Sequence, residues 1–180
     1  MRSSPSVLIL GTAEWDSAIA TNQHHVVREL AEAADVVFVE SLGLRRPTLR
    51  RADVTRMATR ARRAFGRAAP AAAGGRPRPA QTRIASPLVV PMHRAPTRAL
   101  NRAVLMRATA DWLASQSPRV LWTFTPVTYG LESFADVVVY HCVDLLATFP
   151  GIDAVAVERG ERSLATRADG DRPDLYRAAP

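Results

Sequence analysis

The stretch that decides the fold runs from Val137 to Gly151 and reads VVVYHCVDLLATFPG. Its first four residues, three valines and a tyrosine, form a short apolar run that is typical of a fully buried strand. The run stops at His141, and Asp144 follows three residues later. Ligands of open α/β sheets collect just beyond the carboxyl ends of the strands. We therefore look for the functional site around His141 and Asp144.

Similar apolar runs recur along the chain and alternate with helical patterns. We expect strands at 6–10, 36–40, 82–91, 119–123 and 136–140, and helices beginning near 22 and spanning about 96–116, 127–134 and 152–169. The alternation predicts an α/β fold, a Rossmann-like open parallel sheet of about five or six strands with helices on both faces. Expected core positions of the two long helices include Leu100, Leu105, Trp112, Val155 and Leu164.

The composition indicates one globular domain in a reducing compartment. Of the 180 residues, 47% are apolar and 23% are charged, and the formal net charge is +7 with no lysine. A single cysteine, Cys142, rules out an internal disulfide. The apolar run at 7–10 is too short for a secretory signal, and no segment approaches the ~20 apolar residues of a membrane span. These features predict a cytoplasmic protein.

The segment 45–67 carries nine arginines against one acid, Asp53. Met57, Ala61 and Phe65 recur at helical spacing, which predicts an amphipathic helix with a basic face. Two interpretations stay open, contact with an anionic membrane surface and a solvated arginine face. No aromatic residues alternate with the arginines in a nucleic-acid-binding pattern, so we expect no nucleic-acid partner. A low-complexity loop follows at 68–80.

Five stretches carry a family resemblance: VFVESLGLRRPTL (37–49), PLVVPMHR (87–94), LNRAVL (100–105), VLWTFTP (120–126) and VVYHCVDLLATFPG (138–151). Together they resemble the N-terminal domain of GT-B fold glycosyltransferases, close to glycosyl transferases group 1 and family 4. The resemblance implies an enzyme that transfers a sugar from a nucleotide-sugar to a glycan or lipid-linked acceptor in cell-surface polysaccharide or glycolipid assembly. In this family the N-terminal domain mainly holds the acceptor, and a second Rossmann-like domain holds the donor.

The chain departs from the family pattern in two places. Asp144 is followed by Leu145, where relatives often carry a second acid. The chain also reads as truncated: residues 1–169 correspond to the acceptor-side domain, 170–180 form an irregular tail, and the donor-binding domain is absent. We therefore expect this chain alone to be inactive as a transferase.

Glycosyl transfer passes through an oxocarbenium-like state, and the acceptor hydroxyl must be oriented or deprotonated. We assign His141 and Asp144 as candidate catalytic residues, although backbone groups could equally satisfy His141. Further residues follow other predicted strands or flank the first loop and are candidates for substrate binding: Gly11, Asp16, Gln23, His93 and Thr125. For Asp16, a capping role is an equal alternative.

Other chemistry is disfavoured. The Gly-x-Gly-x-x-Gly pattern of dinucleotide-binding loops is absent, and four dispersed histidines with one cysteine predict neither a metal site nor a cofactor. We expect Cys142 to be buried as a small hydrophobe, and one of His24 and His25 to pack inside while the other faces solvent. The alternative function is a non-catalytic α/β binding module with a basic face for a membrane or protein.

Overall fold

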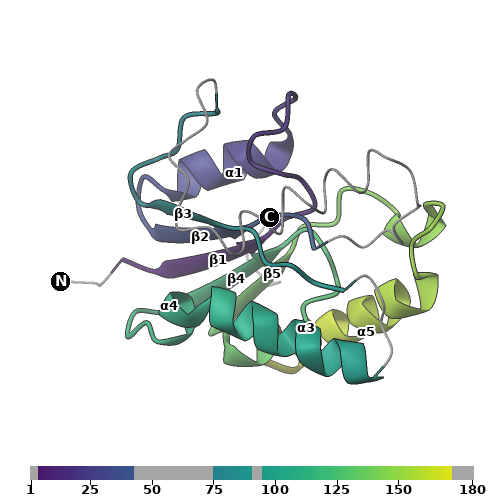
Figure 1. Ribbon diagram of the computed structural model, residues 1–180. Coiled ribbons are helices and arrows are strands. Elements are labelled where there is room, and N and C mark those ends of the chain that lie inside the picture. The colour runs from purple at the N-terminus through teal and green to yellow at the C-terminus, as the bar shows by residue number, and fades with distance from the viewer. Residues whose placement is uncertain (1–3, 43–74, 91–94, 172–180) are drawn as a thin grey trace, which may run out of the picture.

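The computed structural model describes residues 4–42, 75–90 and 95–171 (Figure 1). The predicted basic helix within 45–67 lies outside these residues. The elements are β1 (Ser6–Leu10), α1 (Asn22–Leu30), β2 (Asp35–Val39), β3 (Thr82–Ala85), α3 (Ala95–Ala108), α4 (Ala110–Leu113), β4 (Arg119–Thr123), η1 (Leu131–Phe134), β5 (Val137–Tyr140), η2 (Leu146–Thr148) and α5 (Ala154–Asp171).

The five strands form one sheet in the order β3-β2-β1-β4-β5, and every neighbouring pair is parallel. This confirms the predicted α/β, Rossmann-like open parallel sheet. β1 is central and pairs with both β2 and β4. The chain order therefore reverses beside β1, which is where sheets of this kind tend to bind ligands, at their carboxyl edge.

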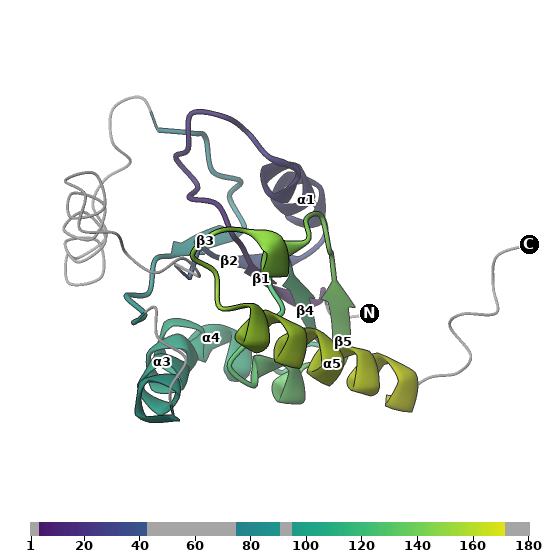
Figure 2. The ribbon, with the colours of Figure 1, turned by 90° about the vertical axis from the view of Figure 1, so that its right-hand side faces the viewer.

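Helices cover both faces of the sheet, as predicted: α1 lies on one face, and α3, α4 and α5 lie on the other (Figures 1 and 2). Alternate residues of each strand point to opposite faces, so the sheet contributes to two separate cores. The α1 side is built from Val7, Ile9, Trp15, Val27, Val36, Phe38 and Phe124. The opposite side is built from Leu8, Leu10, Val37, Val39, Leu105, Trp112, Leu121 and Leu131.

The predicted helix at 96–116 is present as two pieces separated at Thr109. The hydroxyl of Thr109 donates a hydrogen bond to the Leu105 carbonyl 2.9 Å away, a back-bond that often bends helices. Leu105 and Trp112 are fully buried as predicted, and the indole nitrogen of Trp112 donates to the Ser6 carbonyl. Leu100 is 53% exposed, so its predicted place in the core is wrong.

The last helix, α5, packs through Leu164 as predicted, but the prediction for Val155 is wrong. Val155 is 60% exposed, whereas Val157 and Leu164 are buried. Gly160 lies directly against the loop after β4, where an added Cβ would come within 2.3 Å of the Pro126 carbonyl oxygen. In the part of the chain that the structure describes, no helix is long and apolar enough to cross a membrane.

Candidate functional site at the carboxyl edge of the sheet

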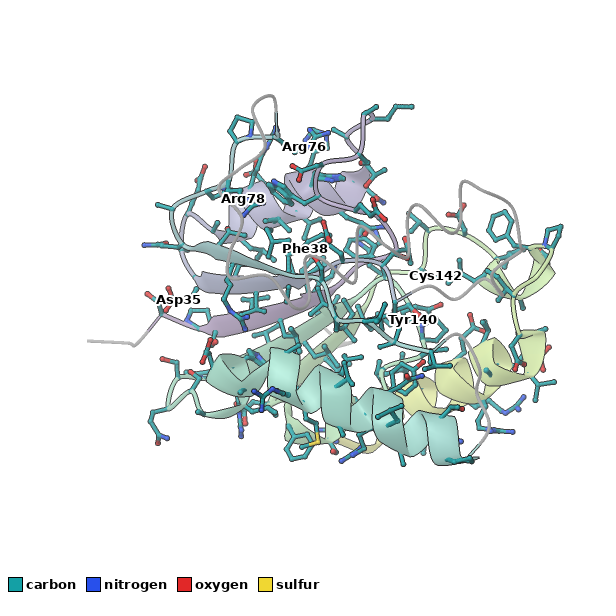
Figure 3. The ribbon with its side chains drawn as sticks, in the orientation of Figure 1. Asp35, Phe38, Arg76, Arg78, Tyr140 and Cys142 are labelled. Atoms are coloured by element: carbon teal, nitrogen blue, oxygen red, sulfur yellow. The ribbon has the colours of Figure 1, made fainter. Side chains whose placement is uncertain are left out.

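All five strands end at one edge of the sheet, because they are parallel. Figure 3 shows the two ends of this arrangement: Asp35 begins β2 at the amino edge, and Cys142 lies beyond β5 at the opposite end. Gly11, Thr125 and His141 each follow a strand and lie at the carboxyl edge. His93 lies outside the described residues, so its predicted position there stays a prediction.

Beyond β1 the edge is closed by the side chain of Gln23, which is 4% exposed. Its Oε1 accepts hydrogen bonds from the backbone N–H groups of Thr12 at 2.9 Å and Ala13 at 3.3 Å. Its Nε2 donates to the Thr12 hydroxyl. Backbone N–H groups after the first strand are the usual anion-binding groups of nucleotide sites. Here Gln23 occupies them, so its amide serves the loop and not a substrate.

Gly11 is needed at this turn because its neighbours leave no room for a side chain. A Cβ at Gly11 would lie 2.7 Å from the Phe38 ring and 2.9 Å from Gln23 Oε1. The N–H of Gly11 donates to the Val39 carbonyl, so the turn continues the sheet hydrogen bonding. Gly11 therefore packs the turn tightly against β2 and α1.

Beyond β2, the buried carboxylate of Glu40 joins the ends of three strands. Glu40 Oε1 accepts a hydrogen bond from the backbone N–H of Trp15 at 2.8 Å, and Oε2 accepts one from the Ser86 hydroxyl. The loops that follow β1 and β3 are thereby tied to the end of β2. We term Gln23, Glu40 and Arg76 the loop clasp, because each fastens the loop after β1 to another segment.

Arg76 fastens this loop from outside (Figure 3). Its guanidinium donates to the carbonyls of Trp15 and Ser17, and its backbone N–H donates to Asp16 Oδ1 at 3.3 Å. The indole nitrogen of Trp15 in turn donates to the Arg76 carbonyl. Asp16, predicted as a substrate-binding residue, is thus engaged in anchoring residue 76.

The two adjacent histidines of α1 divide as predicted, with His24 buried and His25 exposed. Nδ1 of His24 accepts a hydrogen bond from the Thr21 N–H, so the ring proton sits on Nε2. Nε2 faces the carbonyls of Glu14 and Trp15 at 3.2 Å. His24 therefore caps α1 and supports the loop after β1.

The other half of the edge, beyond β4 and β5, has a different character. Thr125 is fully buried, and its hydroxyl accepts a hydrogen bond from the Val127 N–H. The Thr123 hydroxyl donates to the Thr125 carbonyl, and these two contacts shape the turn after β4. This places the Thr125 side chain inside the turn instead of toward a ligand.

His141 lies directly after β5 and is half-buried. Its ring stacks on Phe124 with the centroids 4.7 Å apart and lies 6.0 Å from the ring of Trp122. Its backbone N–H donates to the Thr123 carbonyl, which holds it beside β4. Nδ1 of His141 and Nε1 of Trp122 are buried without a hydrogen-bond partner, which is uncommon in proteins and calls for an explanation.

Cys142 and Asp144 are exposed, so the prediction that Cys142 is buried is wrong. The strand ends at Tyr140, as predicted, but β5 is an edge strand with partly exposed residues, so the prediction of a fully buried strand is wrong. The Tyr140 hydroxyl donates to Glu161 Oε1 at 3.0 Å. Partial burial raises the pKa of the Tyr140 phenol far above its usual value, and hydrogen bonds with Cys142 and Glu161 add to the shift.

A second polar cluster is centred on Asn101, in the middle of α3. This fully buried amide accepts from the Val90 N–H and donates to the Val90 carbonyl, both at 2.8 Å, and donates to the Tyr129 hydroxyl at 3.2 Å. Tyr129 has a φ of +54°, uncommon for a residue with a side chain. Burial raises the pKa of its phenol. Asn101 therefore fixes the backbone of Val90.

The sequence reasoning missed Glu40, Asn101 and Tyr129. Glu40 had a usable signal, because a carboxylate directly follows the apolar run VVFV and so must lie at the carboxyl edge. Asn101 and Tyr129 had none, since their roles depend on contacts between distant segments. Among the described residues there is no cluster of histidine, cysteine and acidic side chains able to hold a metal ion.

Comparisons with known proteins yield no matching family model, no similar curated protein and no similar solved structure.

Proposed function

We propose that this chain forms the acceptor-side domain of a glycosyltransferase that uses a nucleotide-sugar donor. The acceptor is a glycan or a lipid-linked glycan of cell-surface polysaccharide or glycolipid assembly. The observation that carries the proposal is the position of His141, which follows β5 at the carboxyl edge, stacks on Phe124 and is only half-buried, so that part of its ring is open to solvent. An imidazole held rigidly at this edge is suited to orient or deprotonate an acceptor hydroxyl.

The assigned roles follow from the chemistry of the side chains. His141 makes the hydrogen bond to the reacting hydroxyl, and the exposed carboxylate of Asp144 orients the acceptor three residues farther along the same loop. Aromatic faces suit the C–H surfaces of sugar rings through ordinary apolar contact. The partly buried Trp122 lies beside the imidazole, whereas the buried Phe124 supports the imidazole from the core. Gln23, Asp16 and Thr125 act in this scheme as structural residues.

The contacts of the loop clasp support acceptor binding in this domain and donor binding in a separate domain. The N–H groups of Thr12 and Ala13 already have Gln23 as their acceptor, so they are not offered to a diphosphate. The donor nucleotide must then be held by groups outside this edge, in keeping with a separate donor-binding domain. The proposed location is the cytoplasm, with peripheral attachment to the inner face of the plasma membrane through the arginine-rich segment 45–67.

A non-catalytic binding module is the second candidate. The observation that favours it is the exposure of Asp144, because a catalytic carboxylate usually acts in a site that excludes water. Such a module would bind its ligand at the same edge without transferring a sugar.

An NMR titration of the isotope-labelled chain tests the main proposal. The probes are a panel of octyl glycosides as acceptors and UDP-glucose and GDP-mannose as donors. We expect shifts at His141, Phe124 and Asp144 with at least one glycoside, and none with either donor. His141→Gln should abolish these shifts, whereas His25→Gln, a change at the exposed neighbour of His24, should not.

Two results would contradict the proposal. One is the absence of any glycoside binding by a folded chain; the other is donor binding at the clasped loop near Thr12. Sugar transfer by the chain alone would refute the assignment of the donor site to another domain. Binding of glycosides without transfer, even after a donor-binding domain is supplied, would favour the non-catalytic module.

A further inference from the structure

β5 is the last strand of the described sheet, and its outer edge has no strand beside it in the residues that the structure covers (Figure 2). Its sequence, VVVY, contains no charge and no proline. Natural proteins protect open edges with charges, prolines, bulges or a covering segment, because unpaired backbone groups attract another strand. β5 carries neither a charge nor a proline.

The strand at the opposite edge, β3, is protected by Arg83. The guanidinium of Arg83 pairs with Asp111 at 3.4 Å and donates to the Ala108 carbonyl at 2.8 Å. The Arg83 side chain thus extends from β3 to α3 and α4. The edge strand β3 therefore carries a charge, which the edge strand β5 lacks.

Exposed apolar side chains are frequent in the sequence from β5 to the start of α5. Most of the large hydrophobic residues that are exposed in the described part of the chain fall between 137 and 155: Val137, Val143, Leu145 and Val155. Val137 belongs to the strand itself and is 44% exposed. We name these four residues the β5 patch.

We propose that β5 is an interface for a second copy of this chain, in which the two β5 strands pair antiparallel across a two-fold axis. An antiparallel partner satisfies the open N–H and C=O groups. A two-fold contact places the same surface on both sides, so it must complement itself. VVVY does so because it is uncharged. α5, which Tyr140 of β5 contacts through Glu161, exposes both signs in Glu158, Arg159 and Arg162, of which Glu158 and Arg162 pair with each other.

The charge of the whole chain distinguishes this partner from others. Each copy carries +7, so two copies repel at long range, and salt should strengthen their association by screening that repulsion. An acidic partner protein would show the opposite salt dependence. This proposal does not depend on the sugar chemistry above.

The test is sedimentation equilibrium of the purified full chain over a wide concentration range, at low and at high salt. We expect a reversible dimer that tightens with salt. Val137→Lys should weaken it at least about tenfold, because two-fold symmetry introduces the charge twice. Ile19→Lys is the matched control: it adds the same charge at an aliphatic residue that is 77% exposed and outside the β5 patch.

Hydrogen exchange supplies a second measurement, and Val143→Lys a second variant should Val137→Lys fail to fold. In the dimer, the amides of Val137–Tyr140 should be protected more strongly at high protein concentration. A chain that stays monomeric at all concentrations would overturn the proposal. So would a dimer that both lysine variants leave intact, since its interface would then lie elsewhere.

Discussion

At the scale of single residues, buried side chains at the carboxyl edge form hydrogen bonds with the backbone of the loops. Gln23 accepts hydrogen bonds from N–H groups of the loop after β1, Glu40 connects the ends of three strands, and Asn101 binds the backbone of Val90. These three side chains are buried, so leaving their partners without hydrogen bonds is costly. The function proposed above therefore assigns the chemistry to His141 and Asp144, which lie outside this set.

Gln23→Leu should destabilise the protein by about 1–3 kcal/mol, the usual penalty for leaving buried polar partners unsatisfied. The change leaves the N–H groups of Thr12 and Ala13 without their acceptor while keeping most of the side-chain volume. Urea unfolding followed by circular dichroism measures the difference. Gln116→Leu, at an exposed position, is the control and should change the free energy of unfolding little. Equal values for both variants would show that the loop does not depend on Gln23.

Tyr140 should make stability fall as the pH rises into the alkaline range. Its folded-state pKa lies above the usual value of about 10, so the folded protein retains a proton that the unfolded chain loses. The stabilisation is complete below pH ~10 and is lost as the pH rises above it. Unfolding free energies measured across this range should decline less steeply in Tyr140→Phe. An identical decline in both proteins would contradict the assignment.

At the scale of elements, strands were easier to predict than helix faces. The strands 6–10 and 119–123 have the predicted bounds, because buried parallel strands read as continuous apolar runs. Val155 and Val157 lie two residues apart at the start of α5, and periodicity alone did not identify which one is buried. The predicted strand at 82–91 ends at Ala85, and the bend at Thr109 depends on a side-chain hydrogen bond that apolar spacing does not reveal.

The candidate site was predictable in position but not in function. The rule that ligands collect beyond strand ends located Gly11, Thr125 and His141 at the correct edge. It did not distinguish side chains that face a ligand from those that hold the loops, because that depends on partners far apart in sequence. Gln23 contacts Thr12 and Asn101 contacts Val90, in each case a residue 11 positions earlier in the sequence.

Gly160→Ala should destabilise the packing of α5 even though alanine is the better helix former by ~1 kcal/mol. The added Cβ would approach the Pro126 carbonyl oxygen within 2.3 Å, so the helix must move away from the loop after β4. Overpacking of this kind typically costs about 1–3 kcal/mol. Ser163→Ala, on the exposed face of α5, should be neutral or slightly stabilising. Thermal unfolding compares them, and a stabilised Gly160→Ala would show that α5 packs differently.

At the scale of the whole molecule, charge sets the long-range behaviour. All basic residues are arginines, and the net charge is +7. A strongly basic protein is attracted to anionic surfaces whatever its fold. The contribution of the segment 45–67 can be separated from this general attraction by changing its arginines alone.

Arg56→Gln combined with Arg60→Gln and Arg63→Gln should reduce binding to vesicles that contain phosphatidylserine. Each lysine or arginine near an anionic surface contributes about 1 kcal/mol, so the loss should reach two orders of magnitude or so. Binding should also fade with salt, because exposed charges are screened within about 10 Å at 0.1 M. Arg28→Gln with Arg107→Gln and Arg159→Gln, at exposed positions of α1, α3 and α5, removes the same three charges and is the control for net charge. Equal losses would mean that the segment has no special role.

The strand order also determines when β1 can pair with each of its neighbours during synthesis of the chain. β1 pairs on one side with β2, which follows closely, and on the other with β4, which lies more than a hundred positions later. A ribosome adds roughly 5–20 residues per second, so β1 waits several seconds with one side unpaired. Non-local parallel pairing of this kind also slows folding of the finished chain. Nascent chains should therefore recruit chaperones until Arg119–Thr123 has emerged.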